Sequence, residues 1–341
     1  MSNYPRLRFG VIGIDHRHIY DQVKSLLAIG ADCAGYWTHD GDVRTQDGFV
    51  ERFPGIPRIA DRRQLLEDKD VQLITSASIP NERAALAIEV MRHGKDVMVD
   101  KPGMTTLAQL DDVRRVRAET DRIFSINFTE RFEVRAVTVA TDIVRSGAIG
   151  RVLQTVGLGP HRLNRHLRPA WFFDPQKYGG ILADIASHQI DQFLHFTGAE
   201  DATLIKSRIG NLGHPEDPGL EDFGEILLAQ GSASGYIRVD WFTPDGLDTW
   251  GDGRLTILGS EGYLELRKYI DICGRTGKDH LFLVNHEGSR YIDCSAAPLP
   301  YYTNLQNDIF ERTETAMTHA HCFKVCELAL KAQQQAERIP S

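Results

Sequence analysis

Short apolar runs alternate with helical patterns through the first third of the chain. Leu7 to Ile12 is an apolar run that ends at Gly13, and residues 16–28 then carry apolar side chains at helical spacing. The runs that resemble strands are residues 7–12, 33–37, 71–75, 97–99 and 123–126. Helical patterns at residues 82–93 and 106–121 separate the last three of these runs. This alternation predicts a doubly wound α/β domain with a parallel sheet, the opening of a nucleotide-binding fold.

The alternation of predicted strands and helices ends at about Asn127. A helical pattern over residues 134–146 comes first, and the final segment, residues 305–337, is again helical. The strand-like runs between them are residues 152–158, 203–209, 223–228, 233–239, 254–258 and 263–267. Successive strands predict an antiparallel sheet and so a second domain of the α+β type. We therefore expect one domain over residues 1–126 and another over 127–341, with room for the C-terminal helix to pack back on the first.

The composition narrows the class of protein. The chain has 341 residues, 42% of them hydrophobic, and a net charge of −8 with acidic and basic residues mixed. No long basic run favours nucleic acid as a partner, and no apolar run approaches the roughly 20 residues that span a bilayer. The first residues lack a signal-peptide pattern, and five dispersed cysteines without a CxxC pair indicate reduced thiols. We expect a cytoplasmic protein that binds neither nucleic acid nor membranes.

The turn after the first strand is a candidate phosphate-binding loop. A loop of the form Gly-x-Gly-x-x-Gly lets backbone amides approach a pyrophosphate at the start of a helix. Here the turn reads Gly13-Ile14-Asp15-His16-Arg17-His18, so only the first glycine is present and Asp15 takes the second position. That carboxylate repels phosphate unless it is turned away or paired, whereas Arg17 and the two histidines can donate to phosphate. Two interpretations stay open, a dinucleotide site and a plain strand–helix turn.

Further candidates for cofactor contacts follow the second and third strands. Thr38 stands where an Asp or Glu normally holds the ribose hydroxyls, and Asp40 comes two residues later. Because Thr38 is neutral and no basic residue adjoins it, the sequence does not decide between NAD and NADP. Ser78 lies among small residues that permit close approach to a ligand, and Asn81 is a candidate N-cap of the next helix.

A candidate proton-transfer group follows the fourth strand. Residues 97–99 lead into Asp100, Lys101 and Pro102 at the carboxyl end of the strand, where open parallel sheets bind their ligands. A lysine shielded from water there gives up its proton more readily and can exchange it with a substrate hydroxyl. Pro102 restricts Lys101 to an extended conformation, which helps to aim the amine. The competing interpretation is a solvated surface lysine in a turn.

Gly179 and Gly180 open a helical segment with a second chemical cluster. Asp184 and His188 stand at i and i+4, which puts them on one face of a helix, with Asp191 one turn further. His188 can take a hydroxyl proton near neutral pH, and a carboxylate can orient it. The alternatives are a helix start stabilised by Asp184 beside a core histidine, and a metal site. Since the neighbouring histidines match no metal-ligand spacing, we expect no metal.

Together these pieces resemble the Gfo/Idh/MocA family, named for glucose–fructose oxidoreductase and inositol dehydrogenase. Residues 94–102 look like the family's G-K-x-V-x-x-E-K-P, and residues 179–188 look like its G-G-x-x-x-D-x-x-x-H. Residues 127–132 and 146–150 are also similar to family stretches, and the resemblance covers about residues 6–337. The sequence departs from the family pattern at Asp100, where Glu is usual, and in the first loop, where Asp15 and His18 replace glycine or alanine.

The resemblance implies a Rossmann domain followed by an α+β domain whose open antiparallel sheet usually packs into oligomers. It implies a nicotinamide cofactor, NAD or NADP, and a sugar, polyol or related hydroxy substrate. Lys101, Asp184 and His188 match the family's catalytic residues. We therefore expect a homo-oligomer, a dimer or a tetramer, that transfers a hydride between the cofactor and such a substrate.

The expected contacts complete this hypothesis. The cofactor contacts are Gly13, Ile14, Asp15, His16, Thr38, Ser78, Asn81 and Lys101. Arg168, Trp171 and His161, with Trp250, are candidates for the substrate pocket. Two other interpretations remain. One is an enzyme that retains NAD and uses transient oxidation to drive elimination or glycoside cleavage; the other is a binding or regulatory protein that has lost the cofactor.

Overall fold

The protein divides into two compact units. The computed structural model describes residues 5–39 and 43–340. The first unit comprises Met1–Asn127, Gln176–Gly179 and Pro300–Phe323. The second unit comprises Phe128–Pro175, Gly180–Leu299 and Lys324–Ser341. The chain therefore passes between the two units several times.

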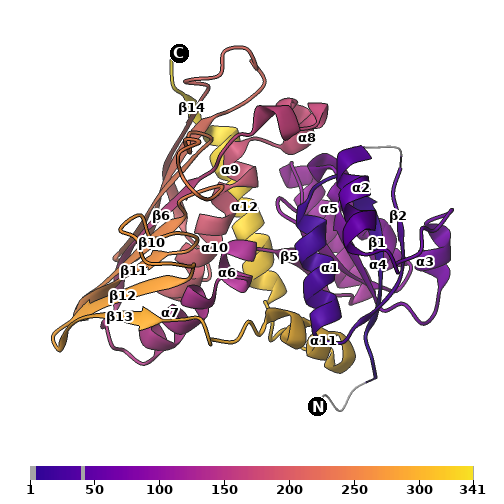
Figure 1. Ribbon diagram of the computed structural model, residues 1–341, viewed down its shortest axis with the longest axis horizontal. Coiled ribbons are helices and arrows are strands. Elements are labelled where there is room, and N and C mark those ends of the chain that lie inside the picture. Colours follow the sequence, from indigo (N-terminus) through magenta and orange to yellow (C-terminus); the bar gives the residue numbers. More distant parts are fainter. Residues whose placement is uncertain (1–4, 40–42, 341) are drawn as a thin grey trace. The chain divides into compact units, whose positions relative to one another are not determined.

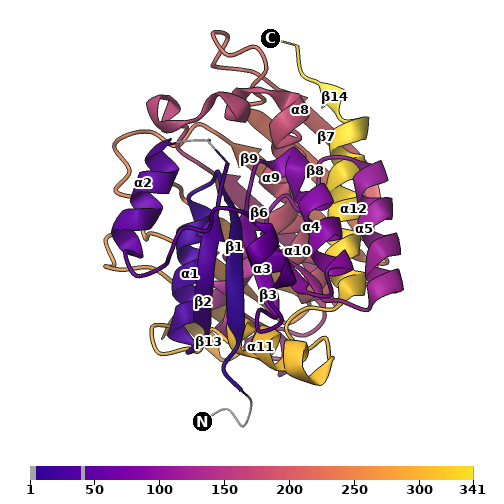
Figure 2. The ribbon, with the colours of Figure 1, turned by 90° about the vertical axis from the view of Figure 1, so that its right-hand side faces the viewer.

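The first unit contains a five-stranded parallel sheet in the order β2-β1-β3-β4-β5. Its strands are β1 (Arg8–Ile14), β2 (Asp32–Trp37), β3 (Leu73–Ala77), β4 (Asp96–Asp100) and β5 (Phe124–Asn127). Its helices include α1 (His18–Ala28), α2 (Val43–Arg52), α3 (Arg63–Glu67), η1 (Pro80–Glu82), α4 (Arg83–Arg92) and α5 (Leu107–Thr120). Helix α1 packs on β2 and β3, and α4 packs on β3 and β4 (Figure 2). Every residue of β3, β4 and β5 is buried, as is usual for strands that helices cover on both faces.

An isolated parallel bridge between Tyr36 and Arg58 extends this sheet beyond β2. The classic Rossmann order is 3-2-1-4-5-6, and the bridge stands where the third strand pairs with the second. When the bridge is counted as a reduced third strand, the sheet has that order with β1 at its centre. The prediction of a doubly wound parallel sheet is confirmed, and α2 is a helix that the sequence pattern did not indicate.

The second unit is built on a nine-stranded sheet in the order β13-β12-β11-β10-β6-β9-β8-β7-β14. Its strands are β6 (Val152–Pro160), β7 (Thr203–Gly210), β8 (Phe223–Gln230), β9 (Ala233–Asp240), β10 (Arg254–Gly259), β11 (Gly262–Arg267), β12 (His280–Asn285), β13 (Gly288–Asp293) and β14 (Glu337–Arg338). The β6–β9 and β7–β14 pairs are parallel, and the other neighbours are antiparallel. The α+β prediction is confirmed, but the sheet is mixed, and the sequence pattern missed β12, β13 and β14.

Helices cover one face of this sheet. Helix α7 (Arg135–Arg145) packs on β11 and β12, and α10 (Ala186–Thr197) packs on β6, β8 and β9 (Figure 1). The side chains that point toward α7, such as Ile257 and Leu264, form a hydrophobic core. The next residues along the strands point the other way, and Leu258, Tyr263 and Tyr291 are 41%, 40% and 40% exposed. The second face of the sheet therefore presents apolar side chains.

Two segments predicted as single helices are interrupted. Residues 181–197 form α9 (Ile181–Asp184) and α10, which are separated at Ile185, so Asp184 and His188 do not share one continuous helix. The Ser187 hydroxyl donates to the Asp184 carbonyl, and the His188 amide donates to the Ile185 carbonyl, so the regular i to i−4 pattern stops here.

The C-terminal segment likewise forms two helices, α11 (Tyr301–Glu311) and α12 (His319–Gln335). Arg312 ends α11 in the left-handed conformation, with φ of 59°. The Asp308 carboxylate then accepts hydrogen bonds from Thr313, Thr315 and the Ala316 amide, which stabilises the turn between the helices. The remaining short helices of the chain are α6 (Thr129–Phe132), η2 (Arg165–Leu167), η3 (Ala170–Phe173) and α8 (Pro175–Tyr178).

No helix in the part of the chain that the structure describes combines the length and the apolar character that crossing a bilayer requires.

Candidate functional site

Gly13 lies in β1 at an irregularity in its pairing with β3, which resumes at Ile14 and Ala77. Its φ is +88°, and a Cβ there would lie 2.6 Å from the Cβ of Ser78, so only glycine fits. Ile14, the next residue, ends β1 and is fully buried. The loops after β1 and β3 flank the position where the strand order reverses, which is where open α/β sheets bind their ligands. The first loop is therefore at the expected edge of the sheet.

Asp15, whose carboxylate was expected to repel phosphate unless it was turned away or paired, is turned inward. Its side chain is 1% exposed, and its Oδ1 lies 3.5 Å from Nε2 of His39. The amides of Asp15 and His16 both donate to the Ala77 carbonyl, at 3.1 and 2.9 Å. The loop is thus held by contacts within the first unit, and the Asp15 carboxylate does not line its surface.

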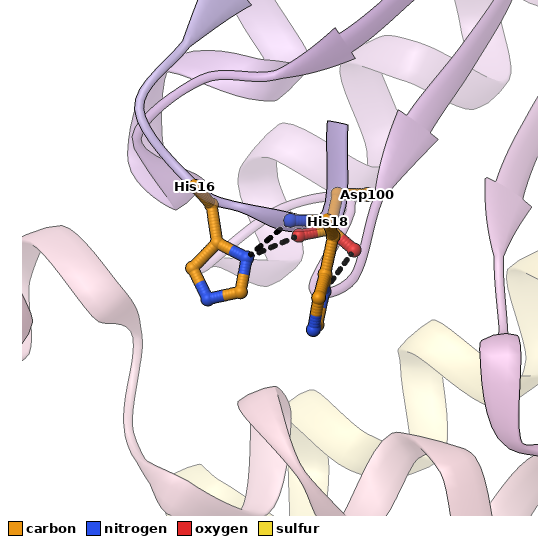
Figure 3. A group of neighbouring side chains, drawn as sticks. All are labelled: His16, His18 and Asp100. Carbon is orange, nitrogen blue, oxygen red and sulfur yellow. Dashed lines mark hydrogen bonds and ion pairs between the residues drawn. The ribbon is translucent and has the colours of Figure 1, made fainter. Parts of the chain in front are cut away.

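His16 and His18 converge on Asp100 at the end of β4 (Figure 3). Nδ1 of His18 is 2.9 Å from one carboxylate oxygen, and Nδ1 of His16 is 3.5 Å from the other. Arg83 donates to Asp100 at 3.2 Å, and both side chains are 1% exposed. Burial alone raises the pKa of Asp100, but His18, Arg83 and His16 outweigh burial and hold this pKa well below its usual range. The carboxylate is therefore ionised, and the sequence analysis did not foresee this cluster.

Lys101 follows β4 and is only 6% exposed, which excludes the interpretation as a solvated surface lysine. The guanidinium of Arg83 donates to the Lys101 carbonyl at 2.5 Å and to the Pro102 carbonyl at 3.0 Å. The Lys101–Pro102 peptide bond is cis. Arg83 thus fixes the backbone that carries the lysine at the carboxyl edge of the sheet.

The other predicted cofactor contacts lie along the same edge. Thr38 is buried, and its hydroxyl donates to the His39 carbonyl at 3.2 Å. Asp40 lies outside the described residues. Asn81 was predicted to be the N-cap of α4, and this prediction is wrong. Asn81 lies within η1, and Glu82 takes the cap position because a short 3-10 turn precedes the helix.

Two buried polar atoms at this edge bear on whether a dinucleotide fits. Within residues 5–39 and 43–340, the Ser78 hydroxyl and the Asn81 side-chain carbonyl are buried and have no hydrogen-bond partner. Buried polar groups normally have partners, so a ligand or a water molecule can supply the partners of these two atoms. With Asp15 turned inward and these atoms at the carboxyl edge of the sheet, the residues present fit a dinucleotide.

In the second unit, α9 begins at a tightly packed glycine. Gly180 has φ of +92°, and a Cβ there would lie 2.1 Å from Cδ of Gln333. The first two amides of α9 donate to Glu221 at 3.0 Å and to Gln333 at 2.9 Å. These bonds satisfy donors that the start of a helix leaves without partners. Two side chains from distant segments thus fix the four-residue helix that carries Asp184.

His188 is 2% exposed on α10, and its ring packs edge-on against Phe128 at a centroid distance of 6.2 Å. Glu130 and Lys268 form an ion pair beside it, with side chains 2% and 0% exposed. Gln189 donates to the same carboxylate at 3.0 Å. Burial alone raises the pKa of Glu130, but Lys268 and then His188 lower it to about 2. An ionised carboxylate thus accompanies the imidazole.

Sequence reasoning missed the Glu130–Lys268 pair because its members are 138 residues apart. Charged residues at such separations are normally solvated, and no spacing rule links them. The nearby Asp191 forms two hydrogen bonds with Arg131, both at 2.7 Å, and so joins α10 to α6. Asp191 therefore has a structural role in this unit.

The predicted substrate contacts lie in an aromatic cluster of the second unit. The His161 ring lies 5.2 Å from that of Trp241, and the Arg168 guanidinium lies 5.0 Å from the same ring. Arg168 also lies over Phe172, whose ring is 5.9 Å from that of Trp171. His161, Arg168 and Trp171 thus share one cluster, and their contact with a substrate stays a prediction.

Trp250 extends this cluster to the surface. Its ring lies 4.6 Å from that of His161 and 4.5 Å from that of Tyr269, and its side chain is 41% exposed. Burial raises the pKa of Tyr269 well above its usual value, so this phenol stays neutral. Trp250 gives the cluster an accessible aromatic ring.

A cavity of about 440 Å³ lies at the opposite edge of the parallel sheet. Gln72 and Lys95, which line it, immediately precede β3 and β4. The Lys95 amine donates to the carbonyls of Asp68 and Val71, and Arg312 binds Asp96 through two hydrogen bonds. Its position at the amino ends of the strands separates this cavity from the site residues of the first unit.

Comparison with known proteins identifies a protein family for both units. Residues 7–128 match a family model described as the oxidoreductase family with an NAD-binding Rossmann fold. Residues 137–265 match the model of a GFO/IDH/MocA C-terminal domain. A crystal structure from Erwinia carotovora atroseptica SCRI1043, of a protein provisionally described as an oxidoreductase, is 45% identical. It covers 98% of this chain and 100% of its own, with a TM-score of 0.94.

More distant relatives have named activities. The scyllo-inositol 2-dehydrogenase (NAD(+)) of Bacillus subtilis (strain 168) is 23% identical over 68% of this chain and 63% of its own length. The structure of a levoglucosan dehydrogenase with NADH is 17% identical, covers 98% of this chain and 100% of its own, and has a TM-score of 0.75, which shows a shared fold. The chain spans 49% to 63% of the length of the first curated relatives that it matches.

Proposed function

Because the chain belongs to the Gfo/Idh/MocA family of oxidoreductases, we propose that it transfers a hydride between NAD or NADP and a sugar, polyol or related hydroxy compound. The observation that carries this proposal is the buried Lys101 at the carboxyl end of β4, within a chain whose two halves match the family models. In this proposal, residues 1–126 hold the cofactor and residues 127–341 provide the substrate site and the subunit contacts.

The residues proposed to hold the dinucleotide lie at or near the carboxyl ends of β1, β2, β3 and β4. They are Gly13, Ile14, Asp15, His16, Thr38, Ser78, Asn81 and Lys101. The buried polar atoms of Ser78 and Asn81 without hydrogen-bond partners support this assignment. When bound, the nicotinamide ring supplies the acceptor or donor of the hydride.

The protein's own part in the reaction is proton transfer at the reacting hydroxyl. We assign to His188 the removal or return of that proton, since an imidazole titrates near neutral pH. We assign to Lys101 the binding of a substrate oxygen and the stabilisation of its charge, and to Asp184 the positioning of His188 or of a second hydroxyl. The ionised Glu130 lies in the surroundings of His188, so it favours the imidazolium that proton removal creates.

The aromatic cluster favours a carbohydrate as the substrate. Small-molecule sites combine apolar and aromatic walls with a few polar groups, a description that fits Trp171 and Trp250 beside Arg168 and His161. The relatives named for inositol and levoglucosan support the same class of compound. We therefore propose that His161, Arg168 and Trp171 contact the substrate.

We also propose a cytoplasmic homo-oligomer, a dimer or a tetramer. The face of the nine-stranded sheet away from α7 and α10 exposes Leu258, Tyr263 and Tyr291, a row that a second subunit can cover. The five cysteines are free thiols, as is usual in a reducing compartment. Analytical ultracentrifugation of the protein and of the Leu258→Asp variant tests the assembly: a smaller species in the variant alone supports the sheet as the contact.

The test of the proposed activity separates binding from turnover. Tryptophan fluorescence is titrated with NADH and with NADPH, and a panel of sugars and polyols is then followed at the nicotinamide absorbance. We expect saturable binding, turnover of at least one compound, and loss of turnover with retained binding in His188→Asn. His195→Asn, on the same helix, serves as the matched control and keeps its activity.

Two results would contradict the proposed oxidoreductase function and support one of the alternatives. Binding without net turnover, but with exchange of a substrate C–H with solvent, indicates an enzyme that retains NAD and drives elimination or glycoside cleavage. Absence of binding to either dinucleotide in a folded protein indicates the regulatory interpretation.

A further inference from the structure

We propose that His16, His18 and Asp100 form a binding site for a divalent transition-metal ion of the Zn²⁺ class. Their ligand atoms, two imidazole nitrogens and a carboxylate oxygen, all lie within 4.8 Å of one another (Figure 3). All three residues belong to the first unit. The site goes beyond the oxidoreductase function proposed above, and because His16 is also a proposed dinucleotide contact, metal binding is tested without dinucleotide.

The spacing of the ligand atoms suits a small ion. Ligand atoms around Zn²⁺ at about 2.0–2.2 Å in a tetrahedral site lie roughly 3.3–3.6 Å apart. Nδ1 of His16 already lies 3.5 Å from the Asp100 carboxylate. Nδ1 of His18 lies 2.9 Å from the other oxygen of this carboxylate, so for a metal to replace the hydrogen bond this contact opens by about 0.5 Å and the carboxylate turns or binds through both oxygens.

The groups that converge here bind metals in their deprotonated forms. Nδ1 of His16 lies 3.3 Å from the His18 amide nitrogen and 3.5 Å from a carboxylate oxygen of Asp100, and a metal ion would replace these contacts. Asp100 is ionised inside the unit, where its carboxylate repels an anion and attracts a cation. Metal ligands must be deprotonated, so binding of the ion releases the proton that Nδ1 of His18 shares with the Asp100 carboxylate.

The donor set narrows the class of ion. Two imidazoles and one carboxylate with open positions are the ligands of catalytic zinc sites and of Fe(II) facial triads, whereas Mg²⁺ and Ca²⁺ prefer oxygen alone. Arg83 donates to Asp100 from outside the site, as second-shell groups orient metal-bound carboxylates. Its positive charge also opposes a cation, so we expect micromolar rather than nanomolar affinity.

Sequence spacing gave no sign of this site because its ligands lie far apart along the chain. His16 lies in the turn after β1, His18 begins α1, and Asp100, 82 residues beyond His18, ends β4. The parallel sheet places these residues at the same edge, because the carboxyl ends of β1 and β4 point the same way.

The test measures metal binding by the full-length, tag-free chain in the absence of dinucleotide. The protein is dialysed against EDTA and titrated with Zn²⁺ by calorimetry in a buffer that does not bind metals, and Co²⁺ is used to read the ligands from its visible spectrum. We expect one ion per chain and at least about tenfold weaker binding in His16→Ala and in His18→Ala. His93→Ala, which removes an exposed histidine at the end of α4, is the matched control and binds as the parent protein does.

Three results would overturn the proposal: no saturable binding by the parent protein, unchanged affinity in both histidine variants, or a Co²⁺ spectrum without nitrogen ligands. The same variants are titrated with inorganic pyrophosphate. If pyrophosphate binding falls in them while Zn²⁺ does not bind, the cluster is an anion site and the metal assignment is wrong. Thermal melts confirm folding, and His18→Gln replaces His18→Ala if the latter does not fold.

Discussion

Glu130 and Lys268 form a buried ion pair in the second unit, with side chains 2% and 0% exposed, and the Glu130 carboxylate acts electrostatically on His188. A buried pair holds its geometry because neither charge can be left alone in a medium that solvates it poorly. The pair therefore links the stability of the unit to the surroundings of the proposed catalytic imidazole.

Breaking this pair from one side is expected to be costly. Lys268→Met leaves the Glu130 carboxylate buried without its partner, and we expect a loss of about 3–5 kcal/mol in the free energy of unfolding. The double variant Glu130→Gln/Lys268→Met recovers much of this loss, because it removes both charges. Urea unfolding measures both. Arg290→Met, which removes an exposed ion pair with Glu287 in the same unit, is the control and costs less than about 1 kcal/mol.

The same carboxylate makes the stability sensitive to acid. The ordinary pKa of a Glu is 4.5, and in the folded protein the pKa of Glu130 is about 2. A lowered folded-state pKa contributes stability that is present above pH 4.5 and is lost as the pH falls toward 2. We expect the free energy of unfolding to decline over this window, and to decline less steeply in Glu130→Gln/Lys268→Met. Urea unfolding at a series of pH values gives the slopes, and equal slopes would contradict the assignment.

Gly13→Ala is expected to damage both the fold and the cofactor site. The new Cβ meets the Cβ of Ser78 at 2.6 Å and adopts φ of +88°, so β1 and β3 must shift. Gly94→Ala serves as the matched control, because Gly94 also has positive φ, +75°, but no heavy atom lies within 4 Å of the added Cβ. We expect Gly13→Ala to cost about 1–3 kcal/mol more than Gly94→Ala in thermal or urea unfolding. Dinucleotide affinity is expected to fall only in Gly13→Ala.

Lys101→Met tests the amine without leaving a gap in its buried position. We expect turnover to fall by about 10²–10³-fold, as is typical for the loss of a group that stabilises charge on the reacting oxygen, while dinucleotide affinity changes only a few-fold. Steady-state rates and fluorescence titrations measure the two quantities. The exposed Lys69→Met in the same unit is the control. Full turnover in Lys101→Met would contradict the role assigned to Lys101.

Most of the fold could be predicted because its signals are local. The apolar runs of β1, β3, β4 and β5 are read from the sequence, and the glycines at the ends of helices and strands bound them. Strand β13 was missed because it is exposed and has no apolar pattern, whereas β12 was overlooked although residues 281–284 form an apolar run. The breaks at Ile185 and Arg312 were missed because they depend on side-chain hydrogen bonds from Ser187 and Asp308.

The candidate site was predictable only in part. Gly13, Lys101 and His188 belong to short motifs whose spacing carries information, so the sequence singles them out. The inward turn of Asp15, the convergence of His16 and His18 on Asp100, and the Glu130–Lys268 pair depend on contacts between residues far apart along the chain. The roles of Lys101, Asp184 and His188, and the domain boundary at residues 126 and 127, stay predictions.

Gln333 on α12 accepts a hydrogen bond from an amide at the start of α9, 151 residues earlier. During synthesis, the short helix that carries Asp184 leaves the ribosome long before this partner exists. Its first turn can reach its final form only when translation has passed residue 333, so a nascent chain that stops earlier carries the Asp184 segment without the acceptor that completes it.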